Sequence, residues 1–228
     1  MAKFKCLMTI VTLLGASCTT HQGFEGYRYN PFQYPYDEYY LKAETIPIDS
    51  IKVDVANNMV KLEFFGLASY VPAVLFNAKT KALKENELIY KSDGKVLIIR
   101  KEKDNMIGCA DEEVRNRNKD LCSAFSSTKE YYNKLFTLTP DDLKSNSAFQ
   151  TGDKWIVHRK GFTFENAIKL DKYVGNSIEA FVSNYNPGRN MTKDVILFSE
   201  RTYPYYLTFA TNITDDMFFR KLLENLTY

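Results

Sequence analysis

The sequence predicts an α+β domain with a mostly antiparallel sheet, flanking helices and a C-terminal helix. Segments in which apolar and polar residues alternate outnumber segments with helical periodicity. Short turns separate most neighbouring strand segments, and short turns favour antiparallel pairing. The last apolar face, in residues 214–226, has helical spacing. Together these observations favour a sheet that a helix closes at the end of the chain.

Two strands are expected at the start of the domain. Apolar and charged side chains alternate in residues 51–55 and again in residues 60–64, which is typical of half-buried strands. Residues 67–84 have helical spacing in part and are interrupted by Pro72. We therefore expect a broken helix in that stretch.

The clearest turn is Asp93-Gly94. It separates two apolar runs, residues 87–90 and residues 95–100. Asp-Gly between such runs is a strong hairpin signal because both residues tolerate the positive φ angles of a tight turn. A β-hairpin is expected here.

Two helix starts follow. Ser127 and Glu130 have the spacing of a capping box, and apolar residues then recur on one helical face. Thr139 precedes Pro140, which suits the first helical position because no donor is needed there. Between the hairpin and these helices, the charged stretch 109–122 is expected to form an exposed loop or a short helix.

The last third is expected to be rich in strands. The candidate strands are residues 155–157, 162–170, 178–185, 195–199 and 205–211. Turns are predicted at Asn186-Pro187-Gly188 and at Tyr203-Pro204. Thr214 is expected to cap the C-terminal helix, with two aspartates in its first turn.

The N-terminus predicts an export signal. Lys3 and Lys5 precede an apolar run over residues 6–14, and small residues then lead to Cys18. A run of this length is too short for a bilayer core, which needs about 20 helical residues. It fits the apolar region of a signal peptide, which we assign to residues 1–17.

The end of this segment, Gly15-Ala16-Ser17-Cys18, resembles the lipobox of bacterial lipoprotein precursors. The resemblance implies cleavage before Cys18, a diacylglycerol thioether on its sulfur and a fatty acid such as palmitate on its amino group. Several acyl chains would then hold the protein on a membrane. Thr19 stands where inner-membrane members of the family carry Asp, which implies the outer membrane and a domain facing the periplasm. The alternative is an ordinary secretory peptide cut near Ser17, which leaves Cys18 as a free thiol.

Three regions follow from this assignment. Residues 1–17 are the signal peptide, residues 18–50 a lipid-anchored tether, and residues 51–228 a single α+β domain. The tether carries eight aromatic side chains between Phe24 and Tyr40. These either pack over the domain as an extended arm or form a patch for a partner, a glycan or lipid headgroups.

The charge balance and the cysteines narrow the function further. The chain has a formal net charge of +2, and removal of the signal takes two lysines away. No basic domain remains, so no nucleic-acid partner is expected.

Cys6 leaves with the signal and Cys18 takes the lipid, so Cys109 and Cys122 are expected to pair in an oxidising periplasm. Their spacing is unlike a redox Cys-X-X-Cys motif, and two cysteines do not make a zinc site.

The most concentrated polar feature is His158-Arg159-Lys160, which the predicted strand at Trp155 precedes. Arg159 and Lys160 together suit a carboxylate or phosphate, with Trp155 beside them. The alternative is a solvated strand end. His158 is also the residue that any Ser-His-Asp or Cys-His chemistry in the domain would have to use. No catalytic residue, metal site or cofactor is assigned.

Three functions remain open. The first is a non-enzymatic envelope lipoprotein whose domain binds an envelope protein or another envelope component. The second is a glycan- or peptidoglycan-binding module that uses exposed tyrosines and Trp155. The third is a hydrolase centred on His158. Aromatic rings that line an open groove would favour the second function, and rings packed against the sheet would favour the first.

Overall fold

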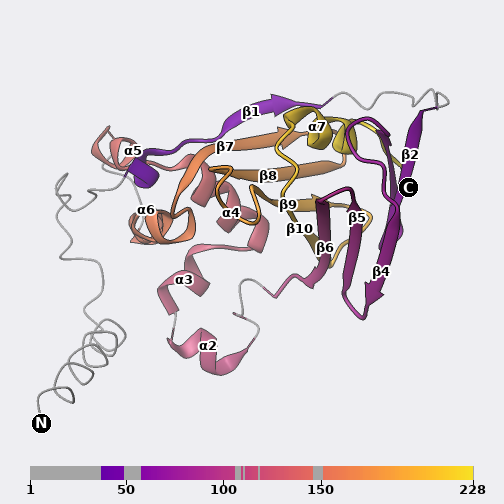
Figure 1. Cartoon of the computed structure of the whole chain (residues 1–228). Coiled ribbons are helices and arrows are strands. Elements are labelled where there is room, and N and C mark those ends of the chain that lie inside the picture. Colours follow the sequence, from indigo (N-terminus) through magenta and orange to yellow (C-terminus); the bar gives the residue numbers. More distant parts are fainter. Residues whose placement is uncertain are drawn as a thin grey trace, which may run out of the picture.

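The computed structural model describes residues 37–48, 58–105, 109, 111–117, 119–145 and 151–227 (Figure 1). One set of strands comprises β1 (Glu44–Pro47), β4 (Thr80–Lys84), β5 (Glu87–Ser92), β6 (Lys95–Lys103), β7 (Ala167–Val174), β8 (Ile178–Tyr185), β9 (Lys193–Ser199) and β10 (Tyr205–Thr211). A second set comprises β2 (Met59–Phe64), β3 (Leu67–Pro72) and β11 (Leu226–Thr227). The helices are η3 (Asp37–Tyr40), α2 (Glu112–Arg117), α3 (Lys119–Ala124), α4 (Thr128–Thr137), α5 (Pro140–Ser145), α6 (Thr151–Thr163) and α7 (Asp216–Glu224).

These strands form two sheets. The large sheet has eight strands in the order β1-β7-β8-β9-β10-β6-β5-β4, and the small sheet has the order β11-β3-β2. Every pairing in both sheets is antiparallel except that of β1 with β7, which is parallel. The predicted α+β class, with its mostly antiparallel sheet and C-terminal helix, is confirmed.

The large sheet separates two hydrophobic cores. Val182 of β8 faces the core that contains α7 and the small sheet, whereas its neighbour Phe181 faces the core beneath α4 and α6. Strand β9 repeats this pattern with Leu197 and Phe198. Because successive side chains of a strand point to opposite faces, the central strands are covered on both sides (Figure 1).

The predicted hairpin over residues 87–100 is confirmed as β5–β6. Its turn residues Asp93 and Gly94 have φ angles of 42° and 79°, the sign that a tight two-residue hairpin turn requires. A second hairpin, β2–β3, turns at Phe65 and Gly66, which also have positive φ.

The helix predicted within residues 67–84 is wrong. Residues 67–72 form β3, whose side chains alternate between buried and half-buried, and residues 80–84 form β4. Strand β3 pairs with β2 and β11, and the Ser69 hydroxyl donates a hydrogen bond of 2.6 Å to the Leu222 carbonyl of α7. Strand β2 is a close neighbour in the sequence, but β11 and Leu222 lie near the other end of the described chain, so local spacing could not reveal those two contacts.

The large sheet begins before residue 51, within the segment predicted as the tether. Strand β1 pairs with β7 in a register that places Glu44 opposite Asp171 and Pro47 opposite Val174. Just before it, Tyr39 is 3% exposed in the core beneath α6. The packed-arm alternative therefore describes this part of the segment. Residues 1–36 and the predicted strand over residues 51–55 lie outside the described residues.

The strand predicted at residues 155–157 is also wrong, because these residues lie in α6. Its apolar residues point in two directions: Ile156 and Val157 are fully buried, whereas Phe162 is 67% exposed. An apolar run on more than one helical face has no 3.6-residue period, so it resembles a strand in the sequence. The predicted strand over residues 162–170 correspondingly starts later, as β7.

The helix starts are close to their predictions. Ser127 caps α4, since its side chain accepts a hydrogen bond from the Glu130 amide at 3.1 Å. The Glu130 carboxylate reaches back to the Ser126 amide at 2.7 Å instead of the Ser127 amide. At α7 the cap is Asp215, which accepts a hydrogen bond from the Met217 amide at 2.9 Å, and the predicted cap at Thr214 is one residue too early.

The contact between Tyr39 and α6 yields a stability prediction. A Cβ atom at Gly161 would lie 2.3 Å from Cε1 of Tyr39, so Gly161→Ala should displace this buried ring. Overpacking of this kind costs roughly 1–3 kcal/mol, which should exceed the gain of about 1 kcal/mol in helix propensity. We expect a lower free energy of unfolding in urea titration.

Two controls make this prediction specific. At Gly188 a Cβ atom meets nothing within 4 Å, so Gly188→Ala should leave the free energy of unfolding nearly unchanged. In a Tyr39→Ala background, Gly161→Ala should be neutral or stabilising, because the clashing ring is gone. Destabilisation by Gly161→Ala that persists in this background would contradict the contact.

Candidate functional site

Two adjoining cavities lie at one end of the large sheet. The first measures about 600 Å³ and is lined by the end of β6, the start of α4, the β7–β8 turn and the β9–β10 turn. The second measures about 510 Å³ and lies against the Cys109–Cys122 pair. Asp104, Ser127 and Tyr203 line both cavities. We call the two together the sheet-end groove.

Hydrogen bonds hold the walls of the groove. The Asp104 amide donates to the Pro204 carbonyl at 2.8 Å, and the Asp104 carboxylate accepts a hydrogen bond from the Thr128 hydroxyl at 2.5 Å. These bonds join the end of β6 to the β9–β10 turn and to α4. The Glu200 amide donates to the Ser177 carbonyl at 3.3 Å and joins the two turns. The groove is therefore built on elements that are tied to one another.

The charges in the groove are of mixed sign. The Glu179 carboxylate lies 2.5 Å from the Lys129 ammonium group and 2.6 Å from that of Lys172. Burial raises the pKa of Glu179, but hydrogen bonds and charge interactions with the two lysines outweigh this effect and hold the pKa below its usual value. The carboxylate is consequently ionised and neutralised by its neighbours.

Two tyrosines border the groove. Tyr203 is 79% exposed and lies between the cavities, and Tyr205 is 37% exposed on the first. The Lys101 ammonium group lies 4.2 Å from the centre of the Tyr205 ring. Sequence reasoning assigned these residues only to a turn and a strand. The available signal was the presence of three tyrosines around Pro204.

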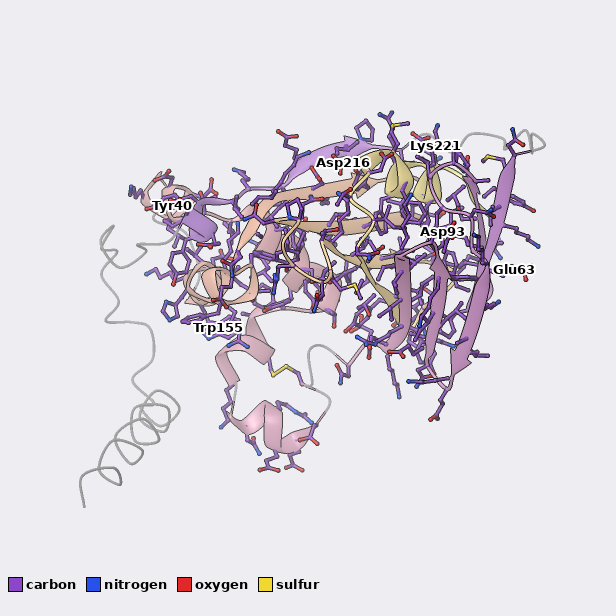
Figure 2. The ribbon with its side chains drawn as sticks, viewed as in Figure 1. Tyr40, Glu63, Asp93, Trp155, Asp216 and Lys221 are labelled. Atoms are coloured by element: carbon purple, nitrogen blue, oxygen red, sulfur yellow. A yellow bond between two sulfur atoms is a disulfide. The ribbon has the colours of Figure 1, made fainter. Side chains whose placement is uncertain are left out.

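The second cavity lies against the paired cysteines. The sulfur atoms of Cys109 and Cys122 are 1.98 Å apart, at disulfide distance, beside α2 and α3 (Figure 2). The predicted short helix between them is thus two short helices. The pair also places Phe125 and Arg115 on this cavity.

The four residues singled out in the sequence lie elsewhere, on α6. Trp155, His158 and Arg159 share one helical face, while Lys160 points to the opposite side and is fully buried. The Arg159 guanidinium lies 5.7 Å from the centre of the Trp155 ring, which itself packs 6.3 Å from the Tyr131 ring (Figure 2). Because they are neighbours in a helix and not at a strand end, Arg159 and Lys160 do not converge on one ligand.

Lys160 has a structural contact in the core. Its side-chain nitrogen donates a hydrogen bond of 2.7 Å to the carbonyl of Leu138, the C-cap residue of α4. The carbonyl end of a helix carries partial negative charge, so it can accept this hydrogen bond from the charged or the neutral amino group. Lys160 therefore joins α6 to the end of α4.

His158 has surroundings that differ from those of a catalytic histidine. Its ring is half-buried and packs edge-to-face on Phe162, with 5.8 Å between the ring centres. Burial, and secondarily the Arg159 charge, lower the pKa of His158. A carboxylate partner that orients a catalytic imidazole would raise this pKa.

Comparison with known proteins gives no information about the site. No family model, curated protein or solved structure matches the chain. Within the described ranges, no helix is long and apolar enough to cross a membrane. In the same ranges, no three side chains of His, Cys, Asp or Glu are grouped so that they would hold a metal ion.

The burial of Lys160 leads to a pH-dependence prediction. Burial lowers the pKa of Lys160 to about 7 from 10.5. Between these values the unfolded chain binds the proton and the folded chain does not, so the free energy of unfolding should rise with pH. Each pKa unit corresponds to about 1.4 kcal/mol, so the full rise is on the order of a few kcal/mol.

Urea unfolding of Lys160→Met at a series of pH values tests this assignment. The variant should show a flatter rise than the natural protein from pH 7 to about pH 9.5, below the range of tyrosine titration. Lys154→Met on the same helix should keep the slope of the natural protein. Parallel curves for the natural protein and Lys160→Met would show that Lys160 is not the group that titrates.

Proposed function

We propose that the protein is a lipid-anchored lipoprotein of the bacterial envelope, and that its domain binds a partner without catalysis. The anchor is Cys18, and the location is the outer membrane with the domain facing the periplasm. The export signal and the lipobox-like Gly15–Cys18 segment support the location. The Cys109–Cys122 pair is in keeping with an oxidising compartment.

The observation that carries the binding role is the sheet-end groove. Each of its cavities falls within the range of about 300–1,000 Å³ typical of ligand sites. Its walls are tied by hydrogen bonds, and the exposed Tyr203 ring stands between the cavities. Because hydrogen bonds already fix the backbone of this turn, a partner would have to order only the side chain of Tyr203.

The chemistry of the groove favours binding over catalysis. Glu179 is paired with two lysines, and its pKa is lowered. A general acid would need a pKa raised toward the working pH. His158, on which the hydrolase hypothesis depends, lies on α6 and does not line either cavity. The packed environments of Tyr39 and Trp155 favour a binding domain over a glycan site built on these two rings.

The anchor predicts a clear effect of one substitution. Cys18→Ser should abolish incorporation of radiolabelled palmitate and release the protein from sedimented membranes, because the thioether can no longer form. Cys6→Ser, which changes a cysteine inside the signal peptide, should leave labelling intact. Palmitate labelling of Cys18→Ser equal to that of the natural protein would overturn the lipid anchor.

The binding site predicts a position-specific crosslink. A photoreactive benzoylphenylalanine at Tyr203 should form a light-dependent adduct in intact cells, because this ring borders the groove. The same group at Phe162, an exposed aromatic position on α6, is the matched control. We expect an adduct at least several times more abundant at position 203, measured by mobility on denaturing gels. Equal yields at both positions, or no adduct at position 203, would contradict binding in the groove.

A further inference from the structure

The geometry points to an uncharged oligosaccharide as the ligand of the sheet-end groove. This inference rests on the proposed binding function and specifies its ligand class. It concerns Tyr203, Tyr205 and the polar groups around them. It does not involve the aromatic segment of residues 24–36 or Trp155.

The first support is the exposed aromatic surface. Tyr203 is 79% exposed on a turn that hydrogen bonds hold in place: the Tyr205 amide donates to the Thr202 carbonyl at 2.8 Å, and the Asp104 amide donates to Pro204. One face of a sugar ring carries C–H bonds with partial positive charge, which match the negative face of an aromatic ring. The Tyr203 hydroxyl can also form hydrogen bonds with sugar hydroxyls.

The second support is the balance of charge. The groove is lined by the acids Asp104, Glu179 and Glu200 and by the bases Lys129 and Arg115, and Lys172 also pairs with Glu179. A groove for a polyanion or a polycation would carry charge of one sign. Sugar hydroxyls donate and accept hydrogen bonds, so a neutral glycan suits carboxylates and ammonium groups placed side by side.

Glu200 offers such a ligand an accessible acceptor. Its side chain makes no hydrogen bond or ion pair with another residue in the described part of the chain, and it is exposed on the first cavity. Its backbone is fixed by the hydrogen bond to Ser177. An ionised carboxylate accepts strong hydrogen bonds from hydroxyl groups. Glu200 therefore offers a defined position for a sugar hydroxyl beside the aromatic surface.

The third support is the combined size of the two cavities. They measure about 600 and 510 Å³ and share Asp104, Ser127 and Tyr203 in their linings. A single sugar would fill only part of this space, whereas a strand of several sugars would run from one cavity to the other across Tyr203. Envelope glycans differ in whether their sugars carry N-acetyl groups, so the test includes both kinds.

The experiment is calorimetric titration of the mature, detergent-solubilised chain. The ligands are chitotetraose, whose sugars carry N-acetyl groups, maltotetraose, which lacks them, and an uncharged hexapeptide. We expect saturable binding of one tetrasaccharide and none of the peptide. Binding of chitotetraose alone would indicate an uncharged glycan of N-acetylhexosamines, and binding of maltotetraose alone a glucan.

Three variants locate the site. Tyr203→Ala should weaken binding about tenfold, the equivalent of about 1.4 kcal/mol. Glu200→Gln, which keeps the shape but removes the charge, should weaken it about threefold, or about 0.7 kcal/mol. Phe162→Ala removes a similarly exposed ring from α6, which lines neither cavity, and should bind as the natural protein does. Circular dichroism verifies that each variant is folded.

The outcomes separate this inference from the proposed function. If neither tetrasaccharide binds at millimolar concentration while position 203 crosslinks in cells, the glycan assignment is overturned and the binding function stands. If the peptide alone binds, the ligand is a polypeptide. If neither tetrasaccharide nor peptide binds and position 203 does not crosslink, both proposals fail. If Phe162→Ala lowers the glycan affinity as much as Tyr203→Ala does, the glycan does not bind in the groove.

Discussion

Strands β8 and β9 have to be covered on both faces, and the remainder of the fold follows from this requirement. Phe181 and Val182 are adjacent, yet they enter different cores. Helices α4 and α6 cover one face, while α7 and the small sheet cover the other. Apolar burial contributes about 25 cal/mol per Å², so the loss of either layer would expose a row of large side chains. Segments from both ends of the described chain are therefore brought to the same sheet.

This covering also generates the groove. Helix α4 lies against β7 and β8, and its start thereby meets the turns at the end of the sheet. Asp104 bonds to both Thr128 of α4 and Pro204 of the β9–β10 turn, so a single residue fixes three segments. The lysines around Glu179 come from α4 and β7, and they make burial of its carboxylate tolerable. The groove is thus a product of packing, and hydrogen bonds fix its walls.

Local signals account for the elements that were predicted correctly. Asp93-Gly94 encodes a hairpin turn through its backbone preferences, and Ser127 encodes a helix start through its side-chain oxygen. Predictions failed where distant partners decide the structure. Residues 67–72 form a strand that pairs with its neighbour β2 and also with β11, which lies near the other end of the described chain. Residues 155–157 were predicted as a strand because α6 carries apolar residues on two sides, which conceals its helical period. Tyr203, Glu179 and Asp104 belong to no sequence motif. Their spacing along the chain therefore could not predict that they line the same cavity.

The sequence by itself determined the α+β class, the β5–β6 hairpin, the starts of α4 and α5 and the expectation of export. These properties depend on alternation, turn chemistry and caps, which act over a few neighbouring residues. Only the tertiary structure decided that α6 buries Lys160 against Leu138, that β1 joins the large sheet, and that Tyr203 stands between two cavities. Each of these depends on contacts between residues far apart in the chain, which form only when both faces of the sheet are covered.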